Sequence, residues 1–498
     1  MIQDIVGAAY DSFYILLFWS PGLLATLLLG VRRLSHALPL GFLLSSVFMS
    51  IVYTTTALAR IPETFWLVSK LAFGAALIGL GVTALIRRPP GLVTNGMVMA
   101  GITAIAVIAR NIFRLDVRPQ YSDQFVIGWI SQLMDSGIDP AALGTVDYIK
   151  RSFIFPLILT AGRDGTITIA LIPIVAILMV MASYHLVRVL TEKTDGKLRV
   201  AVFVAVVLLW ATSSFFWGMF GYQNAHVLVA LGVAVLLSSV FGFRQENESP
   251  WLGPIAGFVA GFVIAQSRIE AVALALLLMI PLLFFSHRRN SNASRRHLIA
   301  LFGAPLGFFL WLVATDAFVF DIVPAPVVAL IFFPLALLFI FPRISAPLGR
   351  VLVPGVFGIL VVLTIWFLLL ADGSEGRRTQ FFVNTFLGDG MWGYGPWAFL
   401  LIVLVTSLWK MPHRDALLLW VTAVAILFTI DVKIIDGLIE VGGIPGFGRG
   451  WTDSTNRAFF HLFAPITAVM ATGIIRSINK EAVFLLQPNK AKAGRQIT

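Results

Sequence analysis

Long runs of apolar residues, broken by short polar stretches, recur from one end of the chain to the other. Each run has about 18 or more residues, the length an α-helix needs to cross a bilayer core of roughly 30 Å. The polar stretches carry Gly, Pro and charged residues, which are typical of turns between helices. The pattern predicts about fifteen membrane spans, centred near residues 20, 48, 75, 102, 176, 208, 234, 259, 278, 305, 331, 360, 402, 422 and 467.

The composition supports this class. Of 498 residues, 58% are hydrophobic and 12% are charged, whereas soluble domains carry about 25% charged residues. Strands of a membrane barrel would alternate apolar and polar residues over about ten positions, and this chain does not. We therefore predict an all-α polytopic membrane protein. The acidic N-terminal stretch "MIQDIVGAAYDSF" lacks Lys and Arg, so it is not expected to be a cleaved signal peptide.

The net charge of +11 comes from 36 Lys and Arg against 25 Asp and Glu. No basic helix interleaved with aromatic residues occurs, so we do not expect nucleic-acid binding. The chain has no cysteine, which excludes disulfides, thiolate metal sites and a cysteine nucleophile. Basic residues instead gather in alternate loops, as they do in membrane proteins whose cytoplasmic side is positively charged.

Charge sorts the loops into two alternating sets. The first set holds about 22 of the 36 basic residues and the second about 19 of the 25 acidic residues. The positive-inside rule places the first set in the cytoplasm, the N-terminus outside and the C-terminus inside. The first set contains "VRRLSH", "IRRPPG", "RVLTEKTDGKLR", "FRQENES", "SHRRNSNASRRH", "PRISAPLGR", "KMPHRD" and the tail from Arg476.

Three long polar segments, 113–166, 371–396 and 431–458, fall on the predicted outer side. We divide the chain accordingly into N-terminal helices (1–94), a central module (95–315) and C-terminal helices (316–498). No fixed-period repeat is sustained and the loops are unequal in length, which disfavours a transporter built of inverted repeats. The search for chemistry therefore concentrates on the outer segments.

The insert after the fourth predicted span contains a short amphipathic helix. In "YSDQFVIGWISQLMDSG", apolar residues recur at helical spacing around Trp129, Ser122 suits the N-cap, and Gly137 suits the end. This helix is too short and too polar to span, so it is expected to lie flat at the interface. Asp123 stands at its start, where the helix macrodipole alone would favour a carboxylate. Asp116, just past the membrane exit, is its nearest rival as a functional acid.

A second short segment, "VDYIKRSFIFPLI", follows and is predicted to be interfacial as well. Lys150 and Arg151 form its basic pair, and Pro156 breaks the apolar run. Later, the outer loop "ADGSEGRRTQFF" carries Arg377 and Arg378 among glycines. That loop is either a lid with cations for phosphate or a plain basic loop near anionic lipid.

Two polar turns interrupt very apolar runs. In "QSRIEA", Arg268 and Glu270 are either a local ion pair at the membrane surface or a phosphate-binding arginine held by its glutamate. In "GYQNAHVL", Tyr222, Gln223, Asn224 and His226 form either an interfacial aromatic belt or a sugar-binding surface. No histidine or carboxylate with metal-ligand spacing accompanies His226, so a resident metal is not predicted, and a loosely held divalent cation stays open.

The last polar segment, "GWTDSTNRAFFHLFAP", runs into the final span. Asp453, Arg457 and His461 are four residues apart and would share one helix face, with Asn456 beside them. An ion pair on a capped helix explains Asp453 and Arg457. A histidine one turn into an apolar span is harder to explain without a function.

This layout resembles the GT-C class of integral membrane glycosyltransferases, chiefly over residues 95–310. The similarity lies in an outer loop with an acid near its start, an aromatic helix ("YSDQFVIGW") and a Pro-containing approach to the next span ("RSFIFPLI"). The segment "DSTNR" is similar to the Asp-Ser-x-Asn-Arg turn before late spans of some bacterial polyprenyl-sugar transferases. The chain departs from many members by its three additional spans before the fourth, and by lacking adjacent acids, since Asp116 and Asp123 are seven apart.

The resemblance implies an inverting transfer of a sugar from a polyprenyl-phosphate carrier to a cell-envelope glycan or lipid acceptor. It implies action at the outer face of a bacterial plasma membrane, without a resident cofactor. Asp123, or Asp116, would be the general base, and the other polar residues named above would bind substrate or phosphate.

Two other functions remain open. An O-antigen polymerase or ligase would depend on Arg and His residues of a late outer loop, which makes the segment from Asp453 to His461 critical. A flippase or transporter of a lipid-linked sugar would need charged residues at mid-span, and these are scarce here.

Overall fold

A computed structural model gives the fold. It describes residues 2–59, 61, 64–113, 153–159, 168–218, 220, 225–242, 250–268, 270–286, 296, 298–314, 332–333, 335–338, 340–341, 345–369, 392–407, 412–441 and 459–486. These residues form helices and turns, with no strand among them. The predicted all-α class is confirmed for this part of the chain.

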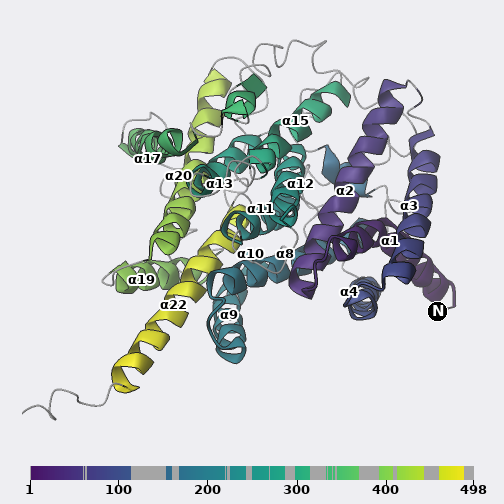
Figure 1. Ribbon diagram of the computed structural model, residues 1–498, viewed down its shortest axis with the longest axis horizontal. Coiled ribbons are helices and arrows are strands. Elements are labelled where there is room, and N and C mark those ends of the chain that lie inside the picture. The colour runs from purple at the N-terminus through teal and green to yellow at the C-terminus, as the bar shows by residue number, and fades with distance from the viewer. Residues whose placement is uncertain are drawn as a thin grey trace, which may run out of the picture.

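Four N-terminal helices stand along one side of the molecule (Figure 1). They are α1 (Ile2–Leu28), α2 (Leu34–Leu58), α3 (Phe65–Arg87) and α4 (Leu92–Phe113). In the most apolar window of α2, 83% of the residues are buried, against 17% for α3. Helix α2 therefore belongs to the interior, and α3 is peripheral.

The central module surrounds α11, whose residues are all buried and which contacts α8 and α12. Its elements are α7 (Ile154–Leu159), α8 (Thr168–Leu190), α9 (Gly196–Ala211), α10 (Ser214–Gly218), α11 (Ala225–Phe241), α12 (Leu252–Ser267), α13 (Ala271–Ser286), η3 (Ile299–Phe302) and α15 (Gly303–Ala314). In Figure 1 these helices lie between the N-terminal and the C-terminal groups.

The C-terminal group, green to yellow in Figure 1, lies on the opposite side from α1–α3. It contains α17 (Ser345–Leu369), α19 (Gly395–Ser407), α20 (His413–Val441), η5 (Phe459–Leu462) and α22 (Phe463–Leu486). Helix α20 runs past residue 431, so the polar segment that is predicted to begin there starts as a helix. The stretch "DVKIIDGLIEV" keeps apolar residues at helical spacing, which lets the helix continue beyond the apolar span.

The membrane character is confirmed, but the predicted number of spans is not. Among the described residues, eight helices are long and apolar enough to cross a membrane, and five further apolar helices are shorter. All predicted span centres except the one near residue 331 lie inside described helices. The difference arises because several buried helices, such as α12 and α13, have 16 residues each.

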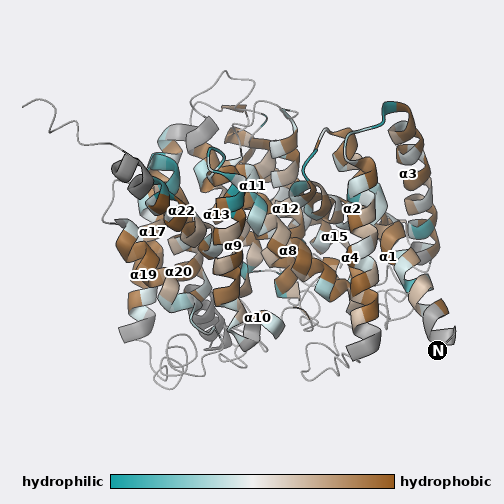
Figure 2. Cartoon of the chain, turned by 90° about the horizontal axis from the view of Figure 1, so that it is seen from below, coloured by the Kyte–Doolittle hydropathy of each residue, from teal (hydrophilic) through white to brown (hydrophobic). Residues whose placement is uncertain are grey.

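The outer helices expose large aliphatic side chains. On α3, Leu71, Ile78 and Ile86 are 65%, 69% and 77% exposed, and α17 shows the same pattern. Extended apolar surfaces of this kind are rare on soluble monomers, and lipid is the solvent that favours them. Figure 2 shows largely hydrophobic helix bodies, with hydrophilic residues mainly toward the helix ends.

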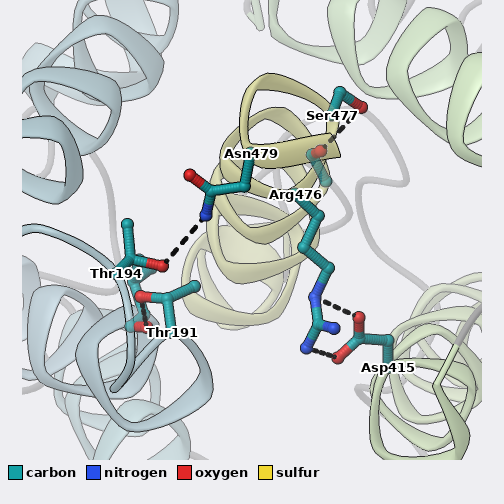
Figure 3. A network of polar contacts seen from close by, with 8 residues as sticks. Thr191, Thr194, Asp415, Arg476, Ser477 and Asn479 are labelled. Atoms are coloured by element: carbon teal, nitrogen blue, oxygen red, sulfur yellow. Dashed lines mark hydrogen bonds and ion pairs between the residues drawn. The ribbon is translucent and has the colours of Figure 1, made fainter. Parts of the chain in front are cut away.

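Basic loops that are far apart in sequence meet at one end of the bundle. Arg476 of α22 donates to Asp415 of α20 at 2.6 Å, and Asn479 donates to Thr194 of the α8–α9 turn at 3.4 Å. Figure 3 shows Arg476 and Asn479 reaching from α22 to these two different neighbours. At the same end Arg414 donates to the Phe241 carbonyl. The loops that charge alone assigns to one side therefore lie together.

The short helix α7, which belongs to the segment that is predicted to be interfacial, is enclosed by protein. All six residues of α7 are buried, and the helix contacts α2, α8 and α12. The sequence "IFPLIL" has no polar face that an interfacial position would require. A segment this short cannot span a bilayer, and its backbone is tolerated inside the bundle because protein surrounds it.

Close helix packing depends on glycines in "GAPLG" of α15. A Cβ at Gly307 would lie 2.6 Å from the Phe262 carbonyl oxygen of α12, and one at Gly303 would overlap the Phe258 carbonyl. We expect Gly303→Ala and Gly307→Ala each to lower the free energy of unfolding by about 1–3 kcal/mol, because the two backbones must separate. Thermal unfolding of the detergent-solubilised protein, followed by tryptophan fluorescence, measures the change.

The matched control is Gly355→Ala on α17, where nothing lies within 4 Å of the added Cβ. This control should be neutral or slightly stabilising, because alanine favours the helix. An equal loss of stability in all three variants would show that close packing of α15 on α12 is not the cause.

Candidate functional site

Two histidines that are distant in sequence meet at the end of the bundle opposite the basic loops. His226 begins α11 and His461 lies in η5, and Nδ1 of His226 is 2.9 Å from Nε2 of His461. The two rings are 2% and 4% exposed. In this hydrogen bond one ring nitrogen donates its N–H and the other accepts. The bond joins the start of α11 to η5, the short helix that precedes α22.

An ion pair lies within electrostatic range of His461. The turn between α12 and α13 holds Arg268 Nε 2.7 Å from Glu270 Oε1, with side chains 15% and 23% exposed. The charges of both residues act on His461. The carboxylate therefore holds a guanidinium whose side chain keeps partial access to the surroundings.

The long segment after α4 returns to the bundle next to this turn. The backbone N–H of Phe153 donates to the carbonyl of Gln266 at 2.9 Å, and Gln266 Nε2 donates to the Gly307 carbonyl at 3.0 Å. The Phe153 ring packs against Tyr53 and Trp311. Phe153 lies two residues after Arg151, and Gln266 lies two residues before Arg268. Their backbone hydrogen bond fixes Phe153, a residue of the predicted polar segment 113–166, to the last turn of α12.

A cluster of aromatic rings lies next to His461. Trp392 packs edge-on against Trp210 at 5.9 Å and against Phe460 at 5.8 Å, and Phe216 lies 5.9 Å from Phe463. Trp210 also donates to Thr467 at 3.1 Å. Trp392 precedes α19 and Phe460 precedes α22, so the cluster ties together the ends of two predicted outer segments.

The structure brings together the four predicted site residues that it describes. Arg268, Glu270, His226 and His461 come from three separate parts of the chain and form one polar group. The other predicted residues lie outside the described residues: Asp116, Asp123, Lys150, Arg151, Tyr222, Gln223, Asn224, Arg377, Arg378, Asp453, Asn456 and Arg457. The predicted interfacial helix around Trp129 also lies outside them.

The polar group combines a guanidinium, a carboxylate and two imidazole rings. Among the described residues no cluster of three or more His, Asp or Glu side chains could hold a metal ion. Arg268 presents a planar fork of donors that matches a phosphate, and Glu270 restricts its orientation. The predicted alternative, a local ion pair, is also consistent with the structure, because Arg268 and Glu270 do form one. His461 lies within electrostatic range of both residues.

Three residues of this region carry no predicted role: Gln266, Trp210 and Trp392. Gln266 stands beside Arg268 in the quoted "QSRIEA", and a buried amide in an apolar helix is itself a signal, because polar groups inside a membrane are costly. The two tryptophans lie in sequence among many other aromatic residues, and nothing in their spacing sets them apart.

No family model, no curated protein and no solved structure matches this chain.

Proposed function

We propose that the protein is a membrane glycosyltransferase of the GT-C type. In this proposal it transfers a sugar, with inversion, from a polyprenyl-phosphate carrier to a glycan or lipid acceptor of the cell envelope. The reaction takes place at the end of the bundle opposite the basic loops. By the positive-inside rule this end is the outer face of a bacterial plasma membrane.

The observation that carries the proposal is the convergence of Arg268, Glu270, His226 and His461 at the bundle end where the long polar segments attach. Charged and polar residues at a membrane boundary are costly unless they have a partner or a function. The Phe153–Gln266 hydrogen bond joins Phe153, which follows Asp123 by 30 residues in the chain, to the helix that leads into Arg268.

The proposed chemistry divides between a base and a cation. An acceptor hydroxyl oxygen forms a bond to the anomeric carbon, and the bond from that carbon to the phosphate oxygen breaks with its electron pair staying on the phosphate. Asp123 accepts the hydroxyl proton, and Arg268 stabilises the charge that remains on the polyprenyl phosphate. Glu270 orients Arg268 through their hydrogen bond.

The remaining predicted residues have supporting roles in this proposal. Lys150, Arg151, Arg377 and Arg378 add positive charge for the lipid phosphate. The polar residues Tyr222, Gln223 and Asn224, which directly precede α11, would contact the sugar. Membrane lipid provides lateral access for the carrier.

The direct test is transfer by the purified full-length protein in phospholipid nanodiscs. Radiolabelled polyprenyl-phosphate sugars are supplied one at a time with an envelope extract as acceptor. We expect label to move into the acceptor and free polyprenyl phosphate to appear, but not with heat-treated protein or empty nanodiscs. Failure with every monophosphate donor would contradict the proposal.

The burial of His461 in the polar group supports a second candidate, a polymerase or ligase of lipid-linked glycans. That function depends on the segment from Asp453 to His461, and the structure places the end of this segment against His226 and the ion pair. Such an enzyme would consume a glycan carried on polyprenyl diphosphate and leave the monophosphate donor untouched. A transporter would move the donor across sealed vesicles without cleaving it.

A further inference from the structure

The opposite, basic end of the bundle contains a second polar group, where the start of α2 meets the end of α8. The rings of His36 and His185 stack with centroids 4.4 Å apart and planes inclined by 24°. Ser35 Oγ lies 3.4 Å from His185 Nδ1. His36 and His185 are 6% and 3% exposed, so this junction is part of the packed interior.

Donors at this junction lack partners. Neither ring nitrogen of His36 has a hydrogen-bond partner, and the buried Nη1 of Arg33 has none either. Arg33 is also the N-cap of α2 and supplies no side-chain cap to the helix. Buried polar groups are nearly always satisfied in folded proteins, so unpaired donors on one helical turn indicate a missing acceptor.

The junction carries a surplus of positive charge. Arg33 and Arg199 both act on Arg188, which stands in the last turn of α8, and among the described residues acting on Arg188 the only carboxylate is that of Glu192. The guanidinium of Arg199 is already occupied by the carbonyls of Thr191, Glu192 and Thr194. Arg33, whose Nη1 has no partner, and Arg188 are the other two arginines of this junction.

We propose that Arg33, His36 and Arg188 form a binding site for a phosphate group at the junction of α2 and α8. Phosphate oxygens accept hydrogen bonds from the guanidinium groups of the two arginines and from the ring N–H of His36. The start of α2 adds the positive end of a 25-residue helix. The stacked His185 ring holds His36 in place.

The phosphate has two sources at a membrane surface: the headgroup of an anionic phospholipid, or a small phosphate in solution. Both present the same oxygens to the site. Two experimental arms separate them, using full-length protein. In the first, sodium phosphate is titrated in detergent against sodium chloride at equal ionic strength. In the second, nanodiscs of phosphatidylcholine are compared with nanodiscs that also contain phosphatidic acid. Thermal unfolding is the readout in both.

Three variants make the test specific. Arg33→Gln removes one fork, and His36→Phe keeps the stacked ring but removes both nitrogens. Arg32→Gln is the matched control, because it removes one charge from the adjacent, exposed position. We expect a saturable rise in the unfolding temperature of the wild type and of Arg32→Gln in at least one arm. Arg33→Gln and His36→Phe should need at least about ten times more ligand, which is the loss of one charge-assisted contact.

A response in the first arm identifies a soluble phosphate, and a response in the second arm alone identifies the lipid headgroup. Either result supports the site. The proposal is overturned if Arg33→Gln responds like Arg32→Gln in both arms, or if the wild type responds in neither. Because the readout is the ligand-dependent shift, Arg33→Gln decides the question even where His36→Phe does not fold.

Discussion

Replacing Asp123 with asparagine is expected to lower the rate of sugar transfer by about 10²–10⁴-fold, the usual contribution of a general base. Asparagine has nearly the same size and still accepts hydrogen bonds through its side-chain oxygen, but it cannot take up the proton of the acceptor hydroxyl. The effect should fall on kcat, because the proton moves in the transition state and substrate binding is unaffected. Initial rates in nanodiscs at saturating donor measure it.

Asp135→Asn is the matched control, since Asp135 lies toward the other end of the same predicted helix. It should retain the wild-type rate, and all variants should unfold at similar temperatures. Asp116→Asn tests the rival acid: if it loses activity and Asp123→Asn does not, the base is Asp116. Full activity in both variants would refute the assignment of the base to this insert.

Replacing Arg268 with leucine should lower kcat by about 10²–10³-fold, the loss seen when one donor to a developing oxyanion is removed. The phosphate gains charge as the glycosidic bond breaks, and Arg268 is the cation that Glu270 holds 2.7 Å away at the candidate site. Lysine at position 268 keeps the charge but not the planar fork, so Arg268→Lys should restore only part of the rate.

A double variant separates catalysis from folding. Arg268→Leu removes the cation that pairs with Glu270 in a partly buried turn, which costs stability, whereas Arg268→Leu with Glu270→Leu removes both charges. We expect the double variant to unfold near the wild-type temperature and to remain as inactive as the single variant. Recovery of sugar transfer in the double variant would show that the ion pair serves stability and that Arg268 does not bind the phosphate.

The bundle architecture is readable from the sequence because lipid imposes strict rules on length and charge. Apolar runs mark the helices, and all predicted centres but the one near residue 331 fall inside described ones. Charge sorting is equally informative: the predicted basic loops near Thr194 and Asp415 both contact the predicted basic tail at Arg476 and Asn479. Both signals are local, since each depends on a stretch of chain and its neighbours.

The site is less readable because its contacts join distant positions. His226 and His461 are separated by 235 residues, and no spacing rule links them. Arg268 and Glu270 are two residues apart, so their pairing is predictable from the sequence. Their position within electrostatic range of His461 is not. The enclosure of α7 is not predictable from its own six residues for a related reason, because the helices that enclose it are α2, α8 and α12.

That enclosure constrains how the chain is assembled as it leaves the ribosome. Helix α7 is completed about 100 residues before the Gln266 carbonyl that holds the Phe153 amide, and earlier still than Trp311, which packs on the Phe153 ring. Six apolar residues cannot remain in a bilayer alone, so the segment must wait outside the hydrocarbon core until α12 and α15 have been inserted. Chain order and final position are thus decoupled here, and Phe153 is held by helices that are synthesised after it.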